Sequence, residues 1–243
     1  MTDRSRVAPV EKEVIIDGRF RGPPDSGNGG YAAGVVAEGI EGTTVVSLRV
    51  PPPLDTPMTL IGDGTESRLM HGTVLVGEAS SATLNLAVPE PPSLAEAVEA
   101  SRRFVWAEGH RLPTCFVCGT DRSHGDGLRI FAGPLDGSDV VAAPWVPDPS
   151  LAAAGEPLDR RYVWSALDCP SYFGLGTTPG ALLGRLTADI SRVPAGGEQL
   201  IAMGWPIEVD GRKHFSASAL ATPAGDVIAR ATAIWIELEE PPY

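Results

Sequence analysis

The chain has 243 residues, of which 43% are hydrophobic, enough to bury one large or two small cores. Its net charge of −12, with Lys and Arg scattered apart from short pairs, argues against nucleic acid as a partner. No apolar run approaches the ~20 residues that span a bilayer, and segment 1–12 lacks the pattern of a signal peptide, so we expect no membrane segment. Three cysteines favour a reducing cytoplasm over a disulfide scaffold.

The first half of the chain is predicted to be rich in strands around one short helix. A strand over 13–21 leads into a Gly/Pro-rich turn at 21–30, and a helix follows over 31–40. Gly34 and the β-branched residues after it weaken the intrinsic propensity of that helix, so it needs burial inside a sheet. Further strands are expected at 43–50, 58–61, 67–76 and 82–88.

A proline-rich linker at 89–92 ends the first run of strands. Ser93 and Glu96 have the spacing of a capping box, which predicts a surface helix over 94–105. The following segment, 111–127, is expected to form a loop.

The second half repeats the first in outline. It is predicted to contain a helix over 161–169 and strands at 128–131, 140–145, 182–193, 199–209, 215–220 and 227–238, with a hairpin turn at Asp210-Gly211. Arg49-Val50-Pro51 recurs as Arg192-Val193-Pro194, and Gly77-Glu78 corresponds to Gly225-Asp226. Two copies of a strand–helix–sheet unit predict an α+β molecule with pseudo-twofold symmetry and a site where the copies meet.

This order of elements resembles the hotdog fold, in which a long antiparallel sheet wraps one central helix. The second half is most similar to the thioesterase branch of that superfamily, through Cys115-Phe116-Val117-Cys118-Gly119, Gly127-Leu128-Arg129-Ile130, residues 145–149 and residues 227–233. The resemblance implies a double hotdog: two antiparallel sheets, each around one helix, in domains 1–110 and 111–243. Because the copies already pair within one chain, both a monomer and a homodimer fit.

The resemblance also implies where the chemistry lies. The unpaired N–H groups at a helix N-terminus suit the oxyanion of a thioester, and glycine leaves the approach open. Gly29 and Gly30 stand at such a terminus, and Asp168 lies where the family has its helix carboxylate. We therefore expect one composite catalytic site that pairs Gly29 and Gly30 with Asp168 across the two copies.

Four further residues are predicted to contact substrate: Asn28, Tyr31, Tyr162 and Trp164. Trp164 precedes Asp168 by one helical turn, so it is a candidate for the wall of an acyl tunnel that desolvates the acid. Glu38 is the candidate second acid, in a reciprocal site whose oxyanion position is filled by the bulky residues at 162–164.

Asp168 also has a purely structural interpretation. Asp-Cys-Pro-Ser fits an N-cap with proline in the first turn, so Asp168 caps a new turn if Pro170 breaks the helix. Catalysis and capping both fit the sequence.

Cys115 and Cys118, flanked by His110 and His124, have the residue types of a zinc site. Their spacing is not a standard ligand pattern, so two half-buried thiols are the favoured interpretation, with a redox disulfide as a minor alternative. Cys169 is expected to be a small core residue.

The resemblance, together with these observations, implies a cytoplasmic acyl-CoA hydrolase that uses no metal and no redox cofactor, with CoA entering only as part of the substrate. Two alternatives stay open: a non-catalytic acyl-CoA binding protein and a zinc-containing structural protein.

Overall fold

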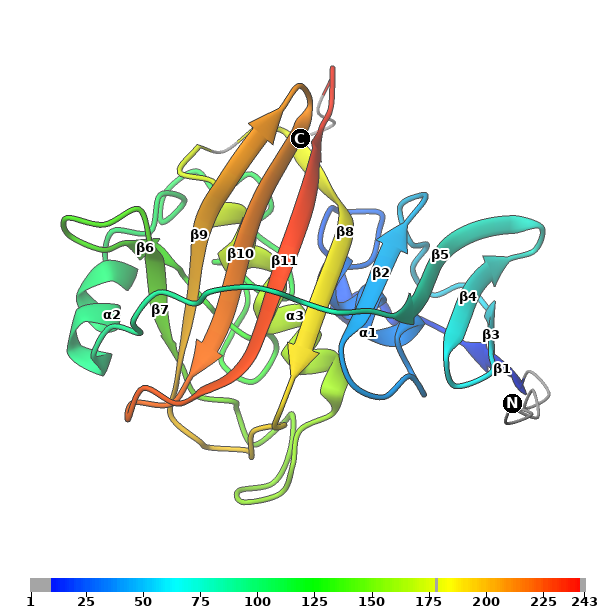
Figure 1. The fold of residues 1–243 in the computed structure, drawn as a ribbon, viewed down its shortest axis with the longest axis horizontal. Helices are drawn as coiled ribbons and strands as arrows, with labels where there is room; N and C mark the ends of the chain where they lie inside the picture. Colours follow the sequence, from blue (N-terminus) through cyan, green and yellow to red (C-terminus); the bar gives the residue numbers. More distant parts are fainter. Residues whose placement is uncertain (1–9, 178, 241–243) are drawn as a thin grey trace.

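The computed structural model describes residues 10–177 and 179–240, and in this part of the chain eleven strands form one antiparallel sheet (Figure 1). The order across the sheet is β1-β3-β4-β5-β2-β8-β11-β10-β9-β7-β6. The strands are β1 Val10–Val14, β2 Thr44–Leu48, β3 Met58–Gly62, β4 Glu66–His71, β5 Val74–Ser81, β6 Gly133–Pro134, β7 Val141–Trp145, β8 Ala181–Ile190, β9 Leu200–Asp210, β10 Lys213–Ala221 and β11 Val227–Glu237.

The sheet order confirms the internal repeat. Outward from β2 come β5, β4, β3 and β1; outward from β8 come β11, β10, β9 and β7, followed by β6. Each half also runs strand, helix and four strands along the chain, as β1-α1-β2-β3-β4-β5 and β7-α3-β8-β9-β10-β11. Arg49 and Arg192 follow β2 and β8, the equivalent strands, whereas Gly77 lies inside β5 and does not match Gly225, which precedes β11.

The prediction of two separate sheets is wrong in one respect, because the two halves share a single sheet. Strand β2 pairs with β8, with Thr44 opposite Ala188 and Ser47 opposite Arg185. Each of these strands would otherwise present an unpaired edge of backbone N–H and C=O groups. Pairing them satisfies both edges and joins the copies side by side.

Two helices, α1 (Gly29–Val36) and α3 (Arg160–Phe173), pack against the sheet and against each other. Asn28 and Asp159 are their N-caps. Every residue of α1 after Gly29 is buried, which agrees with the expectation that this short helix needs tertiary packing.

Helix α3 runs through Pro170, contrary to the expected break. Two hydroxyls bind the carbonyl groups of the turn where proline disturbs the helical pattern: Ser218 Oγ donates to the Leu167 oxygen at 2.6 Å, and Ser171 Oγ donates to the Asp168 oxygen at 2.7 Å. Asp168 therefore lies inside a continuous helix and does not cap a new turn of its own.

The segment after β5 leaves the sheet at Ser81, so the strand predicted at 82–88 is wrong. It crosses in front of the strands of the second half and leads to α2 (Leu94–Ser101), which contacts β6, β7 and β9 (Figure 1). Arg230 of β11 donates to the Leu86 carbonyl at 3.0 Å and fixes this crossing. The capping box of Ser93 and Glu96 is confirmed, but the strand predicted at 128–131 does not form.

Helices α1 and α3 approach closely because two glycines of α1 face α3. A Cβ at Gly30 would lie 2.6 Å from the Trp164 carbonyl oxygen, and a Cβ at Gly34 would lie 2.8 Å from the Arg161 Cα. No side chain fits at either distance without moving one helix.

The close approach predicts that Gly34→Ala lowers the free energy of unfolding by about 1–3 kcal/mol through overpacking. Alanine would otherwise stabilise a helix by about 1 kcal/mol relative to glycine, so the sign is diagnostic. Urea unfolding measures the change. Gly29→Ala is the comparison in the same helix, since its added methyl would meet side-chain atoms of Leu183, Cβ and Cδ2 each at 2.9 Å, and not the backbone of α3. Equal or higher stability of Gly34→Ala would show that this contact does not limit the packing.

Candidate active site

Asp168 lies against the N-terminus of α1, where the two copies meet. Its Oδ2 accepts two hydrogen bonds, from the Asn28 Nδ2 at 2.6 Å and from the Gly30 backbone N–H at 3.0 Å. Asn28 also caps α1, because its Oδ1 accepts from the Tyr31 N–H at 2.9 Å. One carboxamide thus fixes both the start of α1 and the orientation of the acid.

The environment of Asp168 has opposing effects on its protonation. The side chain is 2% exposed, and burial raises its pKa from 3.8 to about 7, against the lowering effect of the bonds from Gly30 and Asn28. The N-terminal end of the α1 dipole also favours the carboxylate. Its second oxygen, Oδ1, is buried and has no hydrogen-bond partner among the described residues. A carboxyl group that ionises near neutral pH and keeps one oxygen unpaired can accept a proton from a bound molecule.

The backbone N–H groups of Gly29 and Gly30 differ in their hydrogen bonding in the structure. The Gly30 N–H is taken by Asp168. The Gly29 N–H is at the first position of α1, and no residue in the described part of the chain accepts a hydrogen bond from it. Gly29 is half-buried and lines a cavity. Of the two amides proposed for the oxyanion, the one at Gly29 is therefore free to bind a ligand oxygen.

The cavity has a volume of about 270 Å³ and lies beside Asp168. Asn28, Gly29 and Asp168 line it together at the start of α1. Apolar and aromatic side chains form most of the remainder, among them Leu48, Val50, Trp106, Leu112, Tyr172, Leu183, Trp235 and Ile236. Such a cavity suits a largely apolar ligand with one polar group directed at α1.

Three predicted substrate contacts lie outside this cavity. Tyr31 stacks on Phe20 with ring centroids 3.9 Å apart, and Tyr162 lies beside the same ring at 6.2 Å. Trp164 is 1% exposed in the core. None of the three is among the residues that line the cavity, whereas Asn28 is.

The counterpart of the site in the other copy lacks the same groups. Asp168 follows the N-cap Asp159 by nine residues, and the residue nine after the N-cap Asn28 is Ala37. Arg160 and Arg161 correspond to the two glycines, and Arg161 binds Asp159. Glu38 is partly exposed and bonds to Lys12 at 2.5 Å, away from the cavity.

Three cysteines also line the cavity, a feature that the sequence interpretation did not assemble. Cys115, Cys118 and Cys169 are all buried. Hydrogen bonds from Cys118 and Cys169 hold the pKa of Cys115 well below its usual value. Donation to Cys115 raises the pKa of both partners well above theirs. Asp168-Cys169 on one helix and the Cys-x-x-Cys loop were visible in the sequence, but their contact depends on the fold.

Solved structures resemble this chain over almost its whole length. A protein of unknown function with a hot dog fold from Alicyclobacillus acidocaldarius covers 98% of this chain and 96% of its own, at TM-score 0.61 and 13% identity. The acyl-CoA thioesterase II TesB2 from Mycobacterium marinum covers 96% and 94%, at TM-score 0.57 and 11% identity. The tesB protein of Mycobacterium avium subspecies paratuberculosis covers 97% and 95%, at TM-score 0.57 and 12% identity.

These matches establish the class: the chain has the hotdog fold, with two copies in one polypeptide. Its structural neighbours are hotdog proteins and thioesterases, as the sequence resemblance predicted. No family model and no curated protein matches the sequence. In the described part of the chain, no helix has the length and apolar character needed to cross a membrane.

The raised pKa of Asp168 predicts a pH-dependent stability. Between pH 3.8 and about 7 the folded protein retains a proton that the unfolded chain has lost. The stabilisation from this group is therefore complete below pH 3.8 and disappears as pH rises through 7, a change on the order of 4 kcal/mol. Asp168→Asn should lack this contribution, so the difference in stability between variant and wild type should change with pH.

Urea unfolding of both proteins from pH 5 to pH 8 checks this, with a chelator present so that cations do not bind carboxylates. A difference that stays constant over this range would contradict the raised pKa.

Proposed function

We propose that this protein hydrolyses acyl thioesters, acyl-CoA in the first instance, with Asp168 as the catalytic acid–base group. One observation carries the proposal: a buried carboxylate is held at a helix N-terminus with one oxygen unpaired, at the wall of a largely apolar cavity. The hotdog thioesterases among its structural neighbours support the same reaction class.

In the proposed complex, the acyl chain occupies the apolar part of the cavity and the thioester carbonyl faces the start of α1. The Gly29 N–H donates to the carbonyl oxygen, where negative charge develops as the carbonyl carbon becomes tetrahedral. The positive end of the α1 dipole stabilises the same charge. The Gly30 N–H serves a different purpose, because it orients Asp168.

Two routes use Asp168 from this position. As a general base, its Oδ1 removes a proton from water while the water oxygen attacks the carbonyl carbon, and the thiol leaves after the tetrahedral intermediate collapses. As a nucleophile, Oδ1 attacks the carbonyl carbon itself, the carbon–sulfur bond breaks and the CoA thiolate leaves, and water then hydrolyses the resulting mixed anhydride to the fatty acid and free Asp168. Neither route requires a redox cofactor.

Asp168→Asn tests the proposal directly. It keeps the shape of the side chain and removes the proton acceptor, so we expect kcat for a panel of short, medium, long and aryl acyl-CoAs to fall by about 100-fold or more. Binding of the acyl-CoA should change much less. Release of free CoA measures turnover, and calorimetry measures binding.

Glu38→Gln is the matched control, since that acid lies outside the cavity and should be dispensable. Turnover that survives in Asp168→Asn would remove the proposed role of the acid. Folded wild-type protein that binds acyl-CoA but never releases CoA would instead establish a non-catalytic acyl-CoA binder.

Hydrolysis in ¹⁸O-labelled water tests the nucleophilic route. If water opens the mixed anhydride at the Asp168 carbonyl carbon, repeated turnover places ¹⁸O in the Asp168 carboxylate, and mass spectrometry of the peptide that contains Asp168 detects it. Attack at the acyl carbon instead leaves Asp168 unlabelled, and trapping of the acyl-Asp168 anhydride with hydroxylamine detects that form of the nucleophilic route. In the general-base route, the label appears only in the released fatty acid. We expect the general-base result, because Asp168 lines the cavity and its Oδ1 has no hydrogen-bond partner among the described residues, so it can accept a proton from water.

A further inference from the structure

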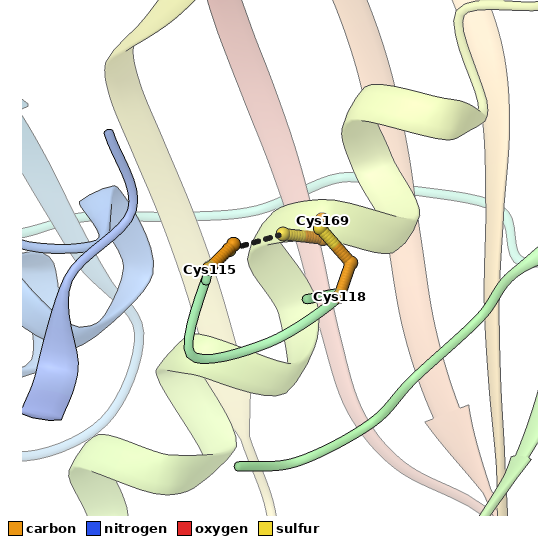
Figure 2. A group of neighbouring side chains, drawn as sticks. All are labelled: Cys115, Cys118 and Cys169. Carbon is orange, nitrogen blue, oxygen red and sulfur yellow. Dashed lines mark hydrogen bonds between the residues drawn. The ribbon is translucent and has the colours of Figure 1, made fainter. Parts of the chain in front are cut away.

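The sulfur atoms of Cys115, Cys118 and Cys169 converge at the cavity wall. Two come from the loop between α2 and β6 and the third from α3, and Figure 2 shows the three side chains meeting. All three Sγ atoms lie within 4.8 Å of one another, and all three cysteines are free thiols. The cluster thus joins two separate parts of the fold.

The spacing of these sulfurs matches the geometry of a thiolate-bound cation. Cys115 Sγ and Cys169 Sγ are 3.8 Å apart. Zinc binds cysteine sulfur at ~2.3 Å in a tetrahedral arrangement, which places any two ligand sulfurs ~3.8 Å apart. The Cys115–Cys169 pair already has this separation. Since all three sulfurs lie within 4.8 Å of one another, a small rotation of the Cys118 side chain would bring its sulfur to the same distance.

The loop that presents Cys115 and Cys118 is held in place independently of any ligand. A Cβ at Gly119 would lie 2.4 Å from the Cys115 carbonyl oxygen, so only glycine permits this tight turn. The backbone N–H of Phe116 donates to the Arg21 carbonyl at 2.8 Å, and that of Ile130 donates to the Val117 carbonyl at 2.9 Å. The two thiols are therefore preorganised over α3.

Neighbouring groups leave the cluster with three protein ligands. His110 uses both ring nitrogens, since Nε2 bonds to the Cys118 carbonyl at 2.9 Å and Nδ1 accepts from the Leu112 N–H at 2.9 Å. Among the described residues, the cluster of potential metal ligands contains the three cysteines but neither His124 nor Asp168. The side of the cluster that faces the cavity remains open.

We propose that Cys115, Cys118 and Cys169 form a three-thiolate site for a thiophilic divalent cation, Zn²⁺ in the first instance, with its fourth position open to the cavity. The sequence disfavours a zinc site made of Cys115, Cys118 and two flanking histidines, because their spacing is not a standard ligand pattern. The fold supplies a different third ligand, Cys169. This proposal does not depend on the hydrolysis of thioesters.

Titration of the full-length protein with Co²⁺ and Zn²⁺ tests the site. The protein is first stripped with a chelator and reduced with a phosphine, and a thiol assay must find three free thiols. We expect one equivalent of Co²⁺ to bind, with thiolate-to-cobalt charge-transfer absorption and the d–d bands of a tetrahedral site, and Zn²⁺ to displace it. X-ray absorption of the zinc-loaded wild type should count three sulfur ligands and one lighter ligand.

Cys169→Ser should weaken cobalt binding at least tenfold and reduce the charge-transfer intensity. His124→Asn is the control and should leave both unchanged, whereas a site built from the loop cysteines and histidines would lose affinity. If Cys169→Ser fails to fold, the sulfur count in the wild type still decides the result. A reduced protein with three free thiols that binds no cation, or a bound cation with fewer than three sulfur ligands, overturns the proposal.

Discussion

The contact between α1 and α3 at Gly30 is the constraint on which the rest of the structure depends. Because Gly30 has no side chain, the start of α1 approaches α3 until its N–H reaches the Asp168 carboxylate. A helix of eight residues is too short to be stable alone, so α1 depends on this packing and on its caps. The interaction that anchors α1 therefore also orients the acid, and the fold and the site share one set of contacts.

The two copies of the hotdog unit have diverged at their equivalent helix starts. In one copy, small residues leave room for a cavity and for a carboxylate from the partner helix. In the other, Arg161 packs over Gly34 and bonds to its own N-cap, Asp159, so the corresponding space is filled by an ion pair. A single chain that contains both copies can retain one site while the other position becomes structural, which a symmetric dimer of identical copies cannot do.

Sequence reasoning found the repeat, most strands and the proximity of Asp168 to the start of the first helix, because alternation, turn residues and the family resemblance are local signals. The failures involve contacts between distant segments. Asn28 and Asp168 are 140 positions apart, so the polar partner of the acid could not be inferred. Helix α3 continues through Pro170, next to which Ser218 of β10 binds the Leu167 carbonyl, and the third thiol of the cluster comes from another element. Each depends on tertiary packing, which overrides local propensity.

The charge of the molecule limits how a thioester would be recognised. With a net charge of −12, the protein repels an anionic carrier unless a local group offsets the field. Arg49 is the only Lys or Arg among the described cavity-lining residues, and it forms an ion pair with Glu78. In the proposed complex, binding free energy then comes mainly from the acyl group in the apolar cavity. Discrimination among substrates should accordingly follow the size and shape of the acyl chain more closely than the phosphate groups of the carrier.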